Sequence, residues 1–294
     1  MISKEAEFIR QTIRQNSISN QTLNEARENM KNMRTVIKFS QNIKQMKLNI
    51  NNVKCELFYN EEFKKDKIIV YFHGGGYCLG ISNNTRNFAA KIASESGFKT
   101  LLVDYRLAPE NKYPSAHEDA LAIYIGLINQ NYKAEDIIFI GDSSGCGLML
   151  AALFKAREKE ILMPAALIFL SPVVDYTKTS KSLITKKLLD PYQYDNPFSI
   201  ADIFLEDNDV KSKFISPLYG DLSLLPPMLI HGSEYDVFFD DSINLAEKAK
   251  KEGVNVILKI WRGLWHVFQV TADIVPEGKE ALKEICEFIN KNFK

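Results

Sequence analysis

The sequence has few cysteines, no excess charge of either sign and no long apolar run. Its four cysteines, Cys55, Cys78, Cys146 and Cys286, lie far apart, which matches neither paired zinc-ligand spacing nor a dense disulfide framework. We therefore expect unpaired, partly buried thiols in a reducing compartment, and no metal site. Lys plus Arg and Asp plus Glu both total 37, so no broad positive field suggests a nucleic-acid partner.

A membrane-spanning segment is also missing from the sequence. No stretch reaches the roughly 18 consecutive apolar residues that a spanning helix needs, and residues 1–15 are amphipathic and charged rather than built around the apolar centre of a signal peptide. We expect a cytoplasmic protein without a membrane span. Hydrophobic residues make up 46% of the chain and charged residues 25%, which is ordinary globular usage and enough for a large buried sheet.

From Lys67 onward, short apolar runs alternate with helical patterns. Strands that are apolar on both faces and separated by amphipathic helices predict a mostly parallel sheet covered by helices on both sides. The residues 47–59 predict one or two further strands. The apolar runs are 68–72, 100–105, 137–141, 166–170, 228–232 and 255–261, and the helical patterns lie near 86–96, 116–129, 146–159, 241–252 and 279–292.

Two segments depart from this alternation. The first 45 residues are polar with a helical pattern, and an insertion from Asp175 to about Pro217 has no clear strand. We interpret the insertion as a lid, because long insertions in compact domains are often functional, and the alternative is an ordinary surface excursion. The apolar positions behind these interpretations are Phe8, Ile9, Ile13, Leu23, Ala26 and Met30 in the first segment, and Tyr192, Tyr194, Phe198 and Phe204 in the second.

The residues Gly141-Asp142-Ser143-Ser144-Gly145 match the pattern G-x-S-x-G. They follow an apolar strand pattern and precede a helical one, so the turn between them must be tight and flanked by small residues. Such a turn exposes the serine hydroxyl at the carboxyl end of the sheet, where open α/β sheets bind ligands. Ser143 is therefore our candidate nucleophile.

A second motif, His73-Gly74-Gly75-Gly76, directly follows the strand pattern at 68–72. Residues without side chains let backbone N–H groups approach an oxygen that becomes negative during acyl transfer. We assign the N–H groups of Gly74, Gly75 and Ser144 to this oxyanion hole. The alternative is a glycine-rich turn that only reverses the chain.

A serine needs a histidine to take its proton. In hydrolases with this serine turn, the chain order is serine, acid, histidine, and only His231 and His266 follow Ser143. We favour His266, because it leaves room for an acid on an earlier loop, whereas His231 ends a strand. His117 lies in a polar segment, and we expect it to be exposed.

The acid should lie in the loop after the strand pattern at 228–232. We choose Asp236, with Glu234 and Asp240 as alternatives in the same loop. For Asp240 and its neighbour Asp241, capping of the next helix suits better than catalysis. Asp175 is a rival, because its loop also follows a strand pattern.

Together these residues resemble the hormone-sensitive-lipase-like family of α/β-hydrolases, which includes many microbial carboxylesterases. The resemblance rests on motifs in the family's order and near its spacing: H-G-G-G-Y at 73–77, D-Y-R-L-A-P-E at 104–110, Y-P-S-A-H-E-D-A at 113–120, G-D-S-S-G at 141–145, L-P-P at 225–227, S-E-Y-D at 233–236 and W-H-V-F at 265–268.

The resemblance implies an α/β-hydrolase fold with an eight-stranded, mostly parallel sheet and a helical cap. The cap would consist of N-terminal helices in residues 1–45 and an insertion at about 176–216, and residues 46–294 would form the catalytic domain. The resemblance also implies Ser143, Asp236 and His266 as the triad. Three positions differ from the usual family pattern: Cys146 and Val267 stand where glycine is usual, and Val237 stands where proline is usual.

We expect a serine esterase that forms an acyl-enzyme on short to medium acyl chains, without a cofactor. Its partner would be a small-molecule ester, and a homodimer is the assembly to test. Cys146 adds bulk beside the serine turn, so we expect it to affect substrate size more than chemistry. The alternatives are an amidase, deacetylase or lactonase with the same three residues, and a non-catalytic receptor that binds a small molecule in the pocket.

Overall fold

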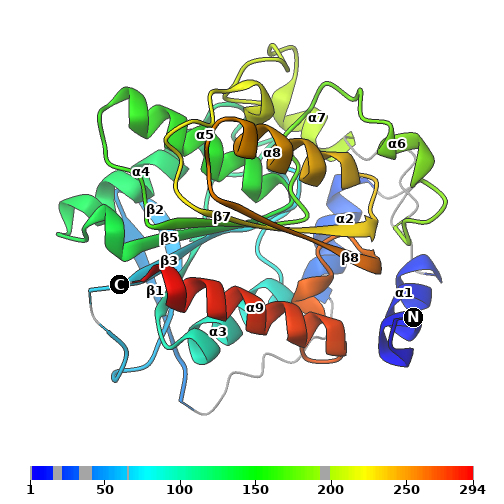
Figure 1. The fold of residues 1–294 in the computed structure, drawn as a ribbon, viewed down its shortest axis with the longest axis horizontal. Helices are drawn as coiled ribbons and strands as arrows, with labels where there is room; N and C mark the ends of the chain where they lie inside the picture. Colours follow the sequence, from blue (N-terminus) through cyan, green and yellow to red (C-terminus); the bar gives the residue numbers. More distant parts are fainter. Residues whose placement is uncertain (1, 16–21, 33–41, 65, 193–198, 294) are drawn as a thin grey trace.

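The computed structural model describes residues 2–15, 22–32, 42–64, 66–192 and 199–293. These residues form a twisted central sheet with helices packed on both faces (Figure 1). This is the layered arrangement that the alternation of apolar runs and helical patterns predicts. Within the described residues, no helix combines the length and the apolar character that crossing a membrane requires.

The sheet has eight strands in the order β1-β2-β4-β3-β5-β6-β7-β8. The six strands from β3 to β8 are parallel, whereas β1 and β2 form an antiparallel hairpin that joins the sheet through β4. The strand bounds are Lys44–Ile50 (β1), Val53–Tyr59 (β2), Ile68–Phe72 (β3), Lys99–Asp104 (β4), Ile137–Asp142 (β5), Ala166–Leu170 (β6), Met228–Tyr235 (β7) and Val256–Trp265 (β8).

The sequence pattern explains the middle and the ends of this sheet. Every residue of β3, β5 and β6 is buried, as a strand between two helical layers requires. The segment at 47–59 forms two strands, because Asn51 and Asn52 both adopt positive φ angles in the tight turn between them. The strands β7 and β8 run farther than the apolar runs alone predict, to Tyr235 and Trp265.

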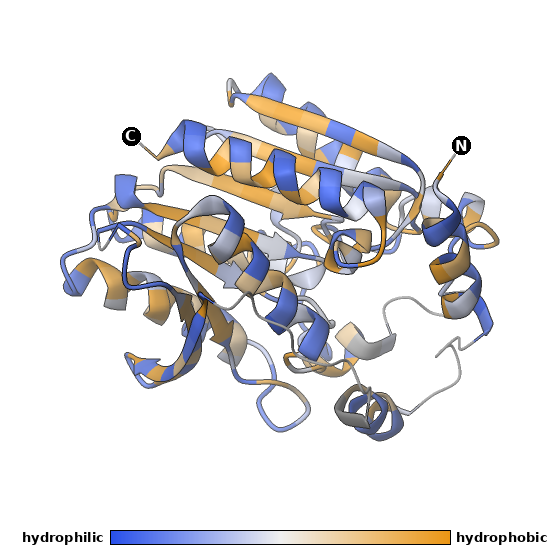
Figure 2. Cartoon of the chain, turned by 90° about the horizontal axis from the view of Figure 1, so that it is seen from below, coloured by the Kyte–Doolittle hydropathy of each residue, from blue (hydrophilic) through white to orange (hydrophobic). Residues whose placement is uncertain are grey.

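Each face of the sheet has its own helical layer and its own apolar core. In Figure 1 the helices α4, α5 and α8 lie above the sheet, and α3 and α9 lie below it. Figure 2 shows largely hydrophobic strands between helices that alternate hydrophobic and hydrophilic residues. The bounds of these helices are Asn83–Ser96 (α3), Ser115–Asn129 (α4), Ser144–Glu158 (α5), Phe239–Lys251 (α8) and Pro276–Asn292 (α9).

Local capping explains where α3 begins and ends. The Ser82 hydroxyl accepts a hydrogen bond from the Thr85 amide at the N-terminus of the helix. At the other end Gly97 takes a left-handed conformation, and its amide donates to the Ala93 carbonyl. The helix therefore starts three residues before the predicted range.

Helices also form in both segments that interrupt the alternation. The N-terminal segment contains α1 (Lys4–Gln15) and α2 (Leu23–Asn32), and the insertion contains α6 (Ser182–Thr185) and α7 (Ser199–Leu205). In the insertion Phe204 is buried and Tyr192 is partly buried. The predictions for Tyr194 and Phe198 lie outside the described residues.

Candidate active site

Ser143 stands in a strained turn between β5 and α5. Its φ and ψ angles are 51° and −125°, a conformation that L-residues rarely adopt. Its amide donates to the Leu170 carbonyl at 3.0 Å, at the end of the neighbouring strand β6. These contacts hold the serine at the carboxyl end of the sheet, where its side chain is free to meet residues from other loops.

His266 and Asp236 meet Ser143 at this edge. Nε2 of His266 lies 2.9 Å from Oγ of Ser143, and Nδ1 lies 2.8 Å from Oδ2 of Asp236. Because the Asp236 carboxylate can only accept, Nδ1 carries a proton and the Nε2 lone pair faces the serine hydroxyl. The three side chains thus form a continuous hydrogen-bonded chain in which the imidazole can take the serine proton.

The loop that carries His266 is held by two further contacts. Val267 adopts a φ of 54°, and its amide donates to Oγ of Ser171 at 3.0 Å. This left-handed conformation favours glycine, which explains why glycine is usual there. Glu234, one of the alternative acids, accepts a hydrogen bond from the Gly263 amide at 2.8 Å and so connects the ends of β7 and β8.

Among the four histidines, His266 alone has a raised pKa. Burial lowers the pKa of His266, but the charge and hydrogen bond of Asp236 outweigh it and the pKa is raised above 6.5. Burial lowers the pKa of His73 to about 4 and of His117 to about 3, and it also lowers the pKa of His231. His266 is therefore the histidine best suited to hold a proton during a reaction.

The expectation that His117 is exposed is wrong. Its ring is fully buried and stacks on Phe204 of α7, with the rings of Tyr77 and Tyr113 also against it. The segment at its position is polar in sequence, but the insertion folds over it. Sequence neighbours cannot reveal burial by a helix about 85 residues away in the chain.

The remaining candidate acids are engaged elsewhere. Asp175 accepts hydrogen bonds from the amide and hydroxyl of Thr177 and from the Tyr219 hydroxyl. Asp240 accepts one from the Ser182 amide, at 2.9 Å. None of these contacts involves a histidine, so Asp236 is the carboxylate that the structure brings to the imidazole.

The expectation that Asp240 and Asp241 cap helix α8 is also wrong. Phe238 occupies the N-cap position and makes no side-chain cap hydrogen bond. The buried Asp241 instead accepts hydrogen bonds from the amides of Val174 and Asp175, at 2.7 and 3.0 Å. It therefore fixes the start of the insertion against α8, a long-range contact that local sequence does not indicate.

The glycine loop lies beside the serine, but its donors are not all free. The amide of Gly74 hydrogen-bonds to the Asp142 carboxylate, and the amide of Gly76 donates to Oγ of Ser144 at 2.9 Å. Among the backbone hydrogen bonds between described residues, none is donated by Gly75 or Ser144. Asp142 thus competes for the Gly74 amide, and the assignment of Gly74, Gly75 and Ser144 to an oxyanion hole stays a prediction.

Asp142 and His73 hold this loop in place, a role that the sequence did not reveal. Asp142 is buried, accepts a hydrogen bond from the Tyr71 hydroxyl at 2.8 Å, and has a pKa raised to about 6 by burial. The Nδ1 atom of His73 lies 2.7 Å from the Gly74 carbonyl oxygen, and its ring stacks on Tyr105. Both side chains thus contact the glycine loop and help to fix its position.

The four cysteines are all unpaired, and all are buried, more completely than expected. Cys146 turns its sulfur toward β5, where Sγ lies 3.0 Å from the Gly141 carbonyl oxygen. Burial raises the pKa of this thiol far above its usual range. The side chain of Cys146 therefore lies in the buried space between α5 and β5.

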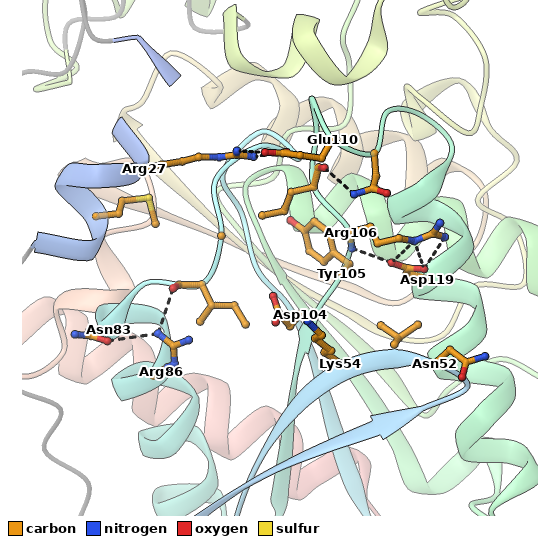
Figure 3. Close-up of a pocket in the computed structure, with 16 residues that line it drawn as sticks. Arg27, Asn52, Lys54, Asn83, Arg86, Asp104, Tyr105, Arg106, Glu110 and Asp119 are labelled. Atoms are coloured by element: carbon orange, nitrogen blue, oxygen red, sulfur yellow. Dashed lines mark hydrogen bonds and ion pairs between the residues drawn. The ribbon is translucent and has the colours of Figure 1, made fainter. Parts of the chain in front are cut away.

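A cavity of about 750 Å³ opens apart from Ser143 and His266, between α2, the β1–β2 turn and the end of β4 (Figure 3). Its arginines are neutralised by carboxylates, as in the pairs Arg27–Glu110 and Arg106–Asp119. Asp104 also lines the cavity, and burial raises its pKa. The cavity thus has charged walls with little net charge, and neither Ser143 nor His266 lines it.

The fold and this hydrogen-bonded chain of serine, histidine and aspartate define a class: an α/β protein built for acyl transfer to serine. A family model described as the alpha/beta hydrolase fold matches residues 69–270. An esterase from Acinetobacter venetianus is 36% identical over 76% of this chain and 74% of its own length. An acetyl-hydrolase from Streptomyces hygroscopicus is 33% identical over 76% of this chain and 75% of its own.

Solved structures agree over the whole chain. An esterase from the bacterial hormone-sensitive lipase family superposes with a TM-score of 0.94 at 34% identity and full coverage of both chains. A structure of EstE5 soaked with p-nitrophenyl butyrate has a TM-score of 0.93, at 34% identity over 99% of each chain. The chain belongs to the α/β-hydrolase fold family, in the group of esterases that resemble hormone-sensitive lipase.

Proposed function

We propose that this protein hydrolyses carboxylic esters through an acyl-enzyme formed on Ser143. Membership of the family makes it a hydrolase of the carboxylesterase type. Two hydrogen bonds support the assignment of the residues. One joins Ser143 Oγ to His266 Nε2 at 2.9 Å, and the other joins His266 Nδ1 to Asp236 Oδ2 at 2.8 Å. Ser143 attacks the ester carbonyl while His266 takes its proton.

The later steps use the same groups. The protonated His266 gives its proton to the leaving alcohol, and water then attacks the acyl-enzyme with His266 again as the base. Asp236 orients the imidazole and stabilises its positive charge. The amides of Gly75 and Ser144 receive the negative oxygen of the tetrahedral intermediate, which each fixed donor stabilises by roughly 3–4 kcal/mol.

We propose esters with short to medium acyl chains as substrates. Support comes from the names of relatives, which include an acetyl-hydrolase and an esterase soaked with a butyrate ester. It also comes from packing beside the glycine loop, where the buried Tyr77 stacks on Phe204 with ring centroids 4.3 Å apart. In this proposal the buried aromatic pair limits the room for a long acyl chain.

The N-terminal helices and the insertion at about 176–216 form, in this proposal, a cap on the catalytic domain. We place the N-terminal boundary just before β1, which begins at Lys44. Arg27 of α2 supports the cap assignment, because its guanidinium donates to the carbonyls of Cys78 and Ala108 and pairs with Glu110. These contacts fasten the helix to the segment that follows the glycine loop.

Two further proposals concern the surroundings of the enzyme. The four unpaired cysteines support a reducing compartment such as the cytoplasm. The strand β8 lies at one edge of the sheet, and an edge strand can pair with a second copy, which supports a homodimer. Light scattering of the purified protein measures the second proposal directly.

The variant Ser143→Ala tests the proposed function. We expect its kcat for p-nitrophenyl acetate to fall by at least about 10⁴-fold and its labelling by a fluorophosphonate probe to disappear. Ser94→Ala, which changes an exposed serine of α3, is the matched control and should keep the wild-type rate. Hydrolysis by Ser143→Ala at the wild-type rate would rule the proposal out.

A further inference from the structure

A second buried carboxylate, Asp190, lies beside the loop that carries Asp236. Asp190 belongs to the insertion and is fully buried. Its Oδ2 atom accepts a hydrogen bond from the Val237 amide at 3.1 Å, and its Oδ1 atom accepts one from the Tyr192 amide at 2.9 Å. The side chain therefore connects the insertion to the residue that follows the proposed acid.

The two carboxylates grip successive amides of the same loop. Asp236 accepts a hydrogen bond from the Phe238 amide at 2.8 Å, while Asp190 takes the amide of Val237. Val237 is buried and lies between Asp236 and Phe238 in the sequence, and its amide donates to Asp190. A shift of the insertion would therefore be transmitted directly to the backbone that aims Asp236 at His266.

The surroundings of Asp190 contain little positive charge. Within the described part of the chain, its carboxylate takes part in no salt bridge with Lys or Arg. The titratable groups that face it are Asp236, His266 and Tyr192. Burial first, and then the charge of Asp236, raises the pKa of Asp190 to about 7.

The charges of three carboxylates act on the imidazole of His266, and Asp236 alone contacts it. They are Asp236 from the end of β7, Asp190 from the insertion and Asp142 from the end of β5, and each of them favours the protonated ring. Asp142 is already engaged by the hydroxyl of Tyr71. Asp190 is thus a source of negative charge near the imidazole that the three-residue mechanism does not use.

We propose that Asp190 is a positioning residue of the reaction: it ties the insertion to the Asp236 loop, and its carboxylate and the imidazolium of His266 stabilise each other's charge. The inference rests on the proposed function, because it assigns a partner to the same hydrogen-bonded chain. It makes the insertion part of the machinery and not only a cover, since the charge on Asp190 reaches His266 only while the insertion is in place.

The molecule offers a matched control in Ser182. Its hydroxyl donates to the Val237 carbonyl at 2.7 Å and accepts a hydrogen bond from the Asp240 amide at 3.2 Å. Ser182 therefore joins the same insertion to the same loop, but without a charge. The variant Ser182→Ala removes a tether alone, whereas Asp190→Asn removes a charge and one of two accepting oxygens while keeping the size of the side chain.

The test is the pH dependence of kcat/KM for p-nitrophenyl acetate, followed at the isosbestic wavelength of p-nitrophenol. Asp190 and His266 favour each other's charged form, so the acid limb reports the apparent pKa of the pair in the free enzyme. We expect Asp190→Asn to move this limb to lower pH by about 0.5 unit or more. We expect Ser182→Ala to leave the limb within about 0.2 unit of wild type. An unmoved limb in Asp190→Asn, or equal shifts in both variants, would overturn the proposal.

Two further variants remove the remaining ambiguities. If Ser143→Ala retains wild-type activity, the proposed function itself fails. If Ser143→Ala is inactive and Asp190→Asn keeps the acid limb of the wild-type pH profile, only the role of Asp190 fails. Circular dichroism establishes that each variant is folded. Should Asp190→Asn not fold, Asp190→Ser replaces it with the same expected shift, and failure of both to fold beside a folded Ser182→Ala would assign Asp190 to the fold alone.

Discussion

Gly145 lies directly against Phe72, so that a β-carbon on Gly145 would stand 2.1 Å from the Phe72 carbonyl oxygen. Phe72 ends β3 and leads into the glycine loop, while Gly145 is the second residue of α5, two positions after Ser143. The serine turn and the glycine loop are therefore pressed together by the sheet itself. This contact places the backbone amides of the loop next to the serine, together with the side chains of Asp142 and His73.

The variant Gly75→Ala should disable the proposed oxyanion hole. Gly75 has a φ of 109°, and a β-carbon there would stand 2.7 Å from Cβ of Leu79, so the loop must move. We expect kcat for p-nitrophenyl acetate to fall by about 10²–10³-fold, as for loss of one fixed donor. Steady-state kinetics measure the effect.

Gly97→Ala is the matched control for this change. Gly97 stands at the end of α3 and also has a positive φ, of 77°. Among the described residues, apart from its chain neighbours, none has an atom within 4 Å of the place that a β-carbon would occupy. We expect a loss of stability of about 1 kcal/mol with kcat unchanged. Equal losses of kcat in both variants would mean that strain, and not the position of the amide, controls the rate.

The pH profile should follow the protonation of His266. Because its pKa is raised above 6.5, the imidazole is protonated at acid pH and cannot accept the proton of Ser143. We expect kcat/KM to rise with pH, with a midpoint above 6.5. In Asp236→Asn the new amide favours the wrong tautomer of His266, so we expect kcat to fall by about 10⁴-fold. The profile is measured with p-nitrophenyl acetate.

Glu234→Gln is the control for Asp236→Asn. It removes a neighbouring carboxylate that does not contact His266. Its amide oxygen can still accept the hydrogen bond from the Gly263 amide, so we expect kcat within about threefold of wild type. A rate as low as that of Asp236→Asn would assign the acid to Glu234 instead.

Replacement of Asp241 should stabilise the protein at alkaline pH. Burial raises the pKa of Asp241 to about 8 from an ordinary value of 3.8, so between these values the folded protein holds a proton that the unfolded chain releases. Wild-type stability therefore falls as pH rises through this window. In Asp241→Asn one amide oxygen can accept both hydrogen bonds that Oδ2 now accepts from Val174 and Asp175, and the titration disappears.

Urea unfolding of both proteins measures this change. We expect the free energy of unfolding of Asp241→Asn, relative to wild type, to be higher at about pH 8.5 than at about pH 5.5 by about 1 kcal/mol or more. Asp221 is an exposed carboxylate whose pKa is lowered by hydrogen bonds from Ser223, so Asp221→Asn should show no such gain. A difference for Asp241→Asn that is independent of pH would contradict the prediction.

Phe204 should limit the length of the acyl chain. It stacks on Tyr77 beside the glycine loop, so Phe204→Leu leaves unfilled space there. We expect the ratio of kcat/KM for p-nitrophenyl octanoate to that for the butyrate to rise about threefold or more. Phe98→Leu, which disturbs an edge-to-face contact with Phe293 on the other side of the sheet, costs a similar stability and should leave the ratio unchanged. If both ratios rise, loosening of the whole protein is the cause.

The sequence by itself determined the elements of the fold, because their signals are local. The strand at 68–72 is apolar at every position, and a strand with this pattern must be buried on both faces. The turn at Ser143 is flanked by glycines, and the chain order of serine, acid and histidine narrows the base to two residues. These features depend on neighbours in the chain, so a reader of the sequence can find them.

Only the tertiary structure decided how distant residues meet. It selected Asp236 among the carboxylates of one loop, because the hydrogen bond to His266 depends on where two strands end. It also buried His117 under the insertion and placed Asp190 beside Val237. Such contacts join segments that are tens of residues apart, and their free energy depends on burial and packing that no local pattern records.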